Sequence, residues 1–187
     1  MPSFIAYISP TQINALVGGT IDTSHGFAGL SFTAPVEILT AQGRSDPLLV
    51  TRQQCCAPGL FRYPAAGGKY VVAQTPDGVF IGPPGLVPGL STRPARPGEM
   101  VTMYGTGFGP TNPPIPPGTA AFAPAVTTYP VLLETDSFMV TPSWAGLIGP
   151  GLYQLNVVVP DVPDGDYRFN PRAAASDGAD AWITIRR

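Results

Sequence analysis

The sequence predicts an all-β protein with two β-sandwich units in tandem. Short apolar stretches of strand length alternate with turn signals along the chain, and no segment shows a helical period with capping residues. Gly and Pro are frequent, with 22 glycines and 24 prolines among 187 residues, yet hydrophobic residues still make up 44%. A disordered chain contains too few residues that can be buried, so this composition predicts a folded protein with many turns.

The first unit is expected within residues 1–90. Runs of apolar residues bounded by turn residues predict its strands at 4–8, 12–17, 32–40, 48–51, 70–74 and 79–81. The pair Asp77-Gly78 predicts a tight hairpin between the last two strands, because this dipeptide adopts the backbone angles of a two-residue turn. Pro and Gly crowd residues 82–98, and this stretch is the predicted boundary with the second unit.

The second unit, residues 91–187, begins with the stretch 97–110, around which the expected fold is organised. A Pro-Gly turn leads into alternating residues that place Val101 and Met103 on one face of a strand. Three glycines follow at every second position, so all three project to one face and leave it without side chains. This spacing predicts a bulge or a close approach of another backbone segment at Gly105, Gly107 and Gly109.

Further strands of the second unit are predicted at 131–134, 137–141, 144–147, 152–159, 167–169 and 181–185. The clearest alternation is in the strand at 152–159, which is typical of a strand with one buried face. The residues expected to face the core from this strand are Tyr153, Leu155, Val157 and Val159.

A short internal echo suggests that the two units are copies of one sandwich. The tripeptides Gln12-Ile13-Asn14 and Gln154-Leu155-Asn156 each place two amides on one face of a strand and an aliphatic side chain on the other. Roughly half of the second unit precedes its copy, whereas almost nothing precedes the first, so the first unit is expected to lack its leading strands. Either residues 60–90 replace them or the chain belongs to a longer protein, and a missing strand leaves a sheet edge open to another chain.

Charge and hydropathy exclude some classes of protein. Charged residues make up 12% of the chain and the net charge is −2. Without a basic stripe, nucleic acid is not an expected partner. No apolar run is long enough to span a membrane, and no signal peptide is recognisable, so export would depend on a signal that this sequence does not contain.

Several motifs occur in order along most of the chain. They are Tyr7-Ile8-Ser9-Pro10-Thr11-Gln12-Ile13-Asn14, Ala57-Pro58-Gly59-Leu60-Phe61, Arg96-Pro97-Gly98-Glu99, Tyr104-Gly105-Thr106-Gly107-Phe108-Gly109-Pro110-Thr111, and Ala145-Gly146-Leu147 with Gly151-Leu152-Tyr153-Gln154-Leu155-Asn156-Val157-Val158-Val159-Pro160. Together they resemble an uncharacterised domain found at the C-termini of many exported acidobacterial proteins. The chain departs from that pattern at residues 20–31 and at Cys55-Cys56.

The resemblance implies immunoglobulin-like sandwich units at the end of a long secreted or surface protein. It implies no established activity and supplies no catalytic residues. The fold expected from the residues and the resemblance together is therefore two immunoglobulin-like β-sandwich units in tandem, with the first incomplete.

Asp22, Ser24 and His25 have the side chains of a hydrolytic triad. A triad requires a base within hydrogen-bond reach of the nucleophile and an acid that orients the base. Near neighbours in one loop rarely reach that geometry, so these residues are catalytic candidates for which a solvated loop is the alternative.

Asp161, Asp164 and Asp166 cluster at a turn and are candidate calcium ligands, because calcium prefers several oxygen ligands on a flexible loop. Such aspartates also form turns without any metal. No other cofactor is expected. The adjacent Cys55 and Cys56 either pack as two small residues at a strand end or form a strained vicinal disulfide.

Trp144, Tyr129 and Tyr104 are the candidate ligand-binding residues, because aromatic rings stack on the apolar surfaces of sugars. Core packing is the alternative role for such residues. Trp144 lies beside a turn, and we expect it to be partly exposed. Glycan binding by sandwich domains is an analogy at the level of the fold.

The expected function is a non-catalytic extracellular or cell-surface module for adhesion, anchoring or spacing, at the C-terminal end of a larger exported bacterial protein. Its expected partners are the upstream domains of that protein and a surface glycan or protein. A carbohydrate-binding module is the first alternative, and a small secreted hydrolase that uses Ser24 and His25 is the second.

Overall fold

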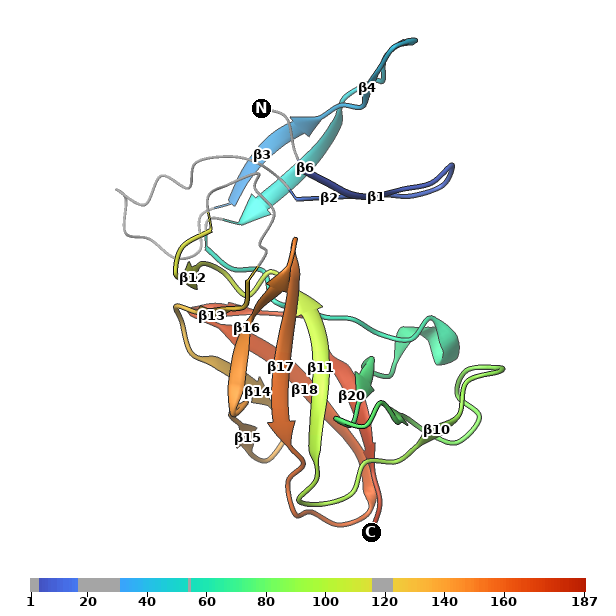
Figure 1. Ribbon diagram of the computed structural model, residues 1–187. Helices are drawn as coiled ribbons and strands as arrows, with labels where there is room; N and C mark the ends of the chain where they lie inside the picture. Colours follow the sequence, from blue (N-terminus) through green and yellow to red (C-terminus); the bar gives the residue numbers. More distant parts are fainter. Residues whose placement is uncertain (1–3, 17–30, 54, 116–122) are drawn as a thin grey trace.

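The computed structural model describes residues 4–16, 31–53, 55–115 and 123–187. These residues form strands and turns, with a single turn of 3-10 helix, η1 (Ala65–Gly68). In the described part of the chain, no helix is long and apolar enough to cross a lipid bilayer. The two largest sheets pack face to face (Figure 1). The predicted all-β class is confirmed, and the arrangement is consistent with a β-sandwich.

The first sheet has nine strands, and the stretch singled out in the sequence lies at its centre. Its strands are β7 (Gly59–Leu60), β8 (Ala73–Gln74), β9 (Phe80–Ile81), β10 (Thr92–Arg93), β11 (Met100–Thr106), β12 (Thr111–Asn112), β13 (Ala125–Thr127), β16 (Trp144–Gly149) and β17 (Leu152–Val158). β11 lies between β17 and β8, and β7 pairs with the C-terminal end of β11. Neighbouring strands are antiparallel except for β9 and β10.

The second sheet has five strands, and backbone from elsewhere in the chain covers one of its edges. Its strands are β14 (Val131–Glu134), β15 (Met139–Val140), β18 (Gly165–Ala173), β19 (Ser176–Asp177) and β20 (Ala181–Ile185). β20 pairs with β18 on one side. On its other side, the N–H of Val71 donates to Trp182 O at 3.0 Å and the N–H of Ala95 donates to Thr184 O at 2.9 Å. These bonds occupy an edge that would otherwise be open to another strand.

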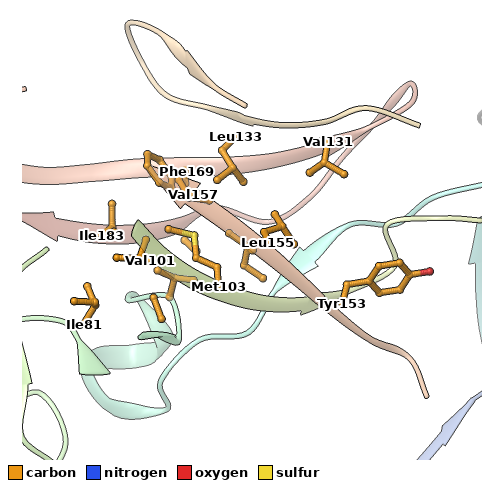
Figure 2. Close-up of a cluster of buried hydrophobic side chains, with 14 of the residues drawn as sticks. Ile81, Val101, Met103, Val131, Leu133, Tyr153, Leu155, Val157, Phe169 and Ile183 are labelled. Carbon is orange, nitrogen blue, oxygen red and sulfur yellow. The ribbon is translucent and has the colours of Figure 1, made fainter. Parts of the chain in front are cut away.

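The core fills the space between the two sheets. Inward and outward positions alternate on the central strands, so Val101 and Met103 of β11 and Leu155 of β17 are fully buried. Figure 2 shows these side chains clustered with Leu133 and Phe169 of the second sheet. Each buried side chain of this size contributes about 1.5–3 kcal/mol relative to an exposed one. The predicted core positions are confirmed, including those at Tyr153, Val157 and Val159.

The glycines at the end of β11 accept a second backbone segment, and the predicted close approach is confirmed. A Cβ on Gly105 would lie 2.3 Å from the carbonyl oxygen of Gly59. A Cβ on Gly107 would lie 2.0 Å from the carbonyl oxygen of Ala57. The N–H of Ala57 donates to Gly107 O at 2.9 Å, so the two segments are joined backbone to backbone. Such packing is open only to residues without a side chain.

The described residues before Cys55 form three antiparallel hairpins. They pair β1 (Phe4–Ile8) with β2 (Ile13–Leu16), β3 (Ser31–Val36) with β6 (Leu48–Gln53), and β4 (Leu39–Thr40) with β5 (Gly43–Arg44). Large apolar side chains on these hairpins are exposed, for example Leu39 at 73% and Leu48 at 67%. Among the residues whose side chains the structure describes, the buried core begins at Cys56.

Strands on both sides of the boundary expected near residue 90 share one sheet. That position falls between β9 and β10, which are hydrogen-bonded neighbours, and β7 and β8 both pair with β11. The two parts of the chain join in one sheet because Gly105 and Gly107 have no side chains, which lets the segment around β7 pack directly against β11. The hairpin predicted at Asp77-Gly78 is confirmed, since it joins β8 to β9.

Replacing Gly107 by Ala should destabilise the fold more than replacing Gly98 by Ala. The φ angles are +76° and +81°, so alanine is strained at both sites. At Gly107 the added Cβ would also collide with the backbone of Ala57, whereas nothing lies within 4 Å of a Cβ at Gly98. We expect losses of about 3–5 kcal/mol and about 1–2 kcal/mol respectively in urea unfolding. Equal losses would contradict the close approach.

Candidate functional site

Outward positions of the first sheet bring aromatic and amide side chains together. Because the inward residues of β11 and β17 are buried, Tyr104, Gln154 and Asn156 face outward and are half-buried. Strand pairing places Tyr104 opposite Gln154, and Asn156 opposite Trp144 of β16. We name this surface the outer face, and its residues are Gln74, Thr102, Tyr104, Trp144, Gln154 and Asn156.

Hydrogen bonds hold the polar side chains of the outer face in place. Gln74 Nε2 donates to the hydroxyl oxygen of Tyr104 at 2.8 Å. Asn156 Oδ1 accepts two bonds, from Gln154 Nε2 at 2.8 Å and from Thr102 Oγ1 at 3.3 Å. Side chains that are already restrained lose less conformational entropy when they contact a ligand. A ligand that contacted this network would meet side chains that are already ordered.

Trp144 lies along the sheet. A Cβ on Gly146 would lie 2.6 Å from both Cζ2 and Cη2 of the indole, which places the six-membered ring over this glycine. Trp144 is half-buried, so the expectation that it is partly exposed is confirmed. A larger residue at position 146 would displace the ring from the sheet. Trp144 and Gly146 together form an aromatic platform that the backbone supports from below.

The structure brings two of the three predicted ligand-binding aromatics to one surface. Trp144 and Tyr104 both lie on the outer face, on the two strands that flank β17. Tyr129 is 40% exposed but lies in the connection between β13 and β14, where the chain passes from the first sheet to the second. Tyr129 is therefore not part of the outer face.

The sequence patterns did not identify the amide side chains of the outer face as candidate site residues. Alternation predicts that Gln154 and Asn156 share one face of a strand, and the structure confirms it. Their position beside Trp144 and Tyr104 depends on the register between strands, which local sequence patterns do not contain. Gln74 belongs to a two-residue strand, and no sequence signal assigns that strand to the edge of β11.

The outer face is electrically neutral. In the described residues, the outward positions of β8, β11, β13, β16 and β17 hold polar, aromatic or aliphatic side chains and no charged one. Charged groups lie elsewhere, for example in the ion pair between Arg93 and Glu99 at 2.8 Å. This face therefore suits an uncharged ligand rather than an acidic or a basic one.

The three aspartates predicted to bind calcium have different partners. Asp161 Oδ1 accepts a bond from the guanidinium of Arg187 at 2.8 Å, and Asp164 Oδ1 accepts one from the backbone N–H of Arg187 at 2.9 Å. Asp166 is held by another set of donors. Among the residues that the structure describes, no three acidic, His or Cys side chains gather closely enough to hold a metal ion. Calcium binding at these residues stays a prediction.

Asp166 links β18 to β20 and to the segment before β8. Its Oδ1 accepts a bond from Thr184 Oγ1 at 2.8 Å, and its Oδ2 accepts bonds from the Tyr70 hydroxyl at 2.8 Å and Lys69 Nζ at 3.1 Å. The Lys69 ammonium also lies 4.7 Å from the ring of Trp182. Partial burial alone would raise the pKa of Asp166, but these hydrogen bonds outweigh it and hold the pKa below its usual value.

Cys55 and Cys56 are free thiols at the start of the sandwich. Cys56 is 2% exposed, and its Sγ would lie 2.6 Å from a Cβ on Gly109. Burial, together with the neighbouring Cys55 thiol, raises the pKa of Cys56 to about 12. Such a thiol stays protonated at neutral pH and is a poor nucleophile. This arrangement matches the alternative in which the two cysteines pack as small residues.

Asp22, Ser24 and His25 lie outside the described residues, so the hydrolase hypothesis stays a prediction. Searches of protein-family models, curated proteins and solved structures found no match to this chain. The outer face is therefore interpreted from its own chemistry.

Replacing Asp166 by Asn should destabilise the protein most at neutral pH. A carboxyl whose pKa is lowered on folding stabilises the fold above its unfolded-state pKa of about 3.9, and this contribution disappears as the pH falls through the lower folded-state value. We expect Asp166→Asn to cost about 1–3 kcal/mol at pH 7 in urea unfolding. The difference from the wild type should narrow below about pH 4. A difference that stays constant with pH would contradict this role, and Asp164→Asn serves as the control at an exposed carboxyl.

Proposed function

We propose that this chain is a non-catalytic adhesion or anchoring module at the C-terminal end of a larger exported bacterial protein. The observation that carries the proposal is the outer face, where half-buried aromatic and amide side chains restrain one another. Such side chains are typical of binding surfaces, since they combine contact area with hydrogen-bonding groups at a low entropic cost. The resemblance to a domain of exported acidobacterial proteins supports the same role and an extracellular or cell-surface location.

The proposal includes two immunoglobulin-like units, of which the first is incomplete. The hairpins β1–β2 and β3–β6 support this, because a two-stranded hairpin requires another layer to bury its apolar side chains. Leu48 and Leu49, whose side chains are each 67% exposed, are examples of residues that such a layer would cover. Upstream domains of the parent protein, or another chain, would supply it. The first unit would then join the module to its parent while the second presents the outer face.

A positive charge beside the outer face should weaken attachment. Val126 pairs with Gly146 next to Trp144 and is 49% exposed, so Val126→Lys adds an ammonium group there without disturbing the core. We expect the full chain, fused to a fluorescent protein, to co-sediment saturably with isolated bacterial cell envelopes. Val126→Lys should weaken this attachment roughly tenfold or more.

Met139→Lys is the matched control, because Met139 is 61% exposed on the second sheet. It should attach like the wild type, and equal losses in the two variants would argue against the outer face. A wild-type chain that does not co-sediment would contradict the anchoring role. Ester hydrolysis by the purified chain that is lost in His25→Ala would favour the hydrolase instead.

A further inference from the structure

The outer face offers one ring surface that is ready for stacking. The indole of Trp144 rests on Gly146, so the backbone supports one side of the ring while part of the side chain remains accessible to solvent. A ring held in this way does not have to give up rotamer freedom when a ligand contacts it. The ligand surface that matches it is apolar and about as wide as a six-membered ring.

Hydrogen-bonding groups with spare capacity lie on the three strands next to that of Trp144, which are β17, β11 and β8. Asn156 Oδ1 already accepts two bonds, and its Nδ2 has no hydrogen-bond acceptor among the described residues. The Oε1 atoms of Gln154 and Gln74 likewise accept no bond from a described residue, because these amides use their Nε2 atoms as donors. The Tyr104 hydroxyl accepts a bond from Gln74 and retains its own proton for donation. The face therefore offers both donors and acceptors to a ligand.

Sugar rings match both features. Each hydroxyl group of a sugar donates and accepts hydrogen bonds, and the C–H groups of a pyranose form an apolar patch that stacks on an aromatic ring. The absence of formal charge at the outward positions favours a neutral sugar over a uronic acid or an amino sugar with a free ammonium group. Protein partners usually meet interfaces rich in arginine as well as aromatic residues, and this face has no arginine in the described residues.

The width of the face indicates an oligosaccharide rather than a single sugar. Trp144, Asn156, Thr102 and Gln74 lie in register on four adjacent strands, β16, β17, β11 and β8. Three spacings of about 4.8 Å separate the first strand from the last, which gives a row of about 14 Å. The four side chains of the row are half-buried on the outward side of the sheet, so a polysaccharide chain would pass across them.

On this basis we propose that the outer face binds a neutral polysaccharide, with one sugar ring stacked on Trp144 and its neighbours hydrogen-bonded to Asn156, Gln154 and Tyr104. This inference rests on the proposed anchoring function and specifies its ligand. It assigns Trp144 the central role and the amides a supporting one.

Affinity electrophoresis and sedimentation of the full chain with xylan, cellulose and chitin test this ligand class, with polygalacturonate as the acidic comparison. We expect the wild type to bind at least one neutral polymer and Trp144→Ala to weaken that binding roughly tenfold or more. Trp144→Phe, which keeps a smaller ring, should give an intermediate loss. Tyr129→Ala is the matched control, because it removes an exposed aromatic outside the outer face.

Thermal unfolding of each variant shows whether the fold is intact, and Asn156→Ala provides a second variant if Trp144→Ala is unfolded. Failure to bind any neutral polymer, wild-type affinity in Trp144→Ala, or equal binding of polygalacturonate would overturn the proposal. Envelope attachment that is lost in Val126→Lys but retained in Trp144→Ala would also overturn it, while leaving the anchoring function in place. That result would indicate a protein ligand on the same face.

Discussion

The sandwich depends on one backbone contact, the packing of residues 57–60 against Gly105 and Gly107. The two segments approach so closely that a single Cβ on either glycine would overlap a carbonyl oxygen. This contact pairs β7 with β11, brings the chain towards β8, and lets the connection between them reach the edge of β20. Because it is built from main-chain atoms, it requires glycine rather than any particular chemistry. Sheet order on this side of the molecule follows from it.

The outer face follows from the same strand geometry that builds the core. Side chains alternate across a strand, so burying Val101, Met103 and Leu155 obliges their neighbours to face solvent. The antiparallel register then aligns Thr102, Asn156 and Trp144 in one row. A slip of one residue between strands would send the amides into the core, where their polar groups would lack partners. Core packing and the candidate binding surface are therefore specified together.

The sequence predicts well where the strands lie, but it predicts poorly which strands pair with one another. The strands at 4–8, 131–134 and 181–185 were predicted with the bounds that the structure has, because period-two alternation and turn residues are local signals. Sheet order depends on contacts between distant residues, so nothing local indicates that β8 lies beside β11. For the same reason, the sequence alone did not distinguish Tyr129 from Trp144 as a candidate ligand-binding residue. In the structure, Tyr129 lies in the connection between the two sheets and not on the outer face. The support of Trp144 by Gly146 is likewise a two-residue relation that no composition or pattern expresses.

The last strand, β20, is hydrogen-bonded on both of its sides. It pairs with β18 on one side and with Val71 and Ala95 on the other. Peeling it away would release backbone bonds to three separate parts of the chain and expose Ile183 and Ile185 together. We therefore expect opening of this strand to be coupled to global unfolding and its amide protons to be among the slowest to exchange.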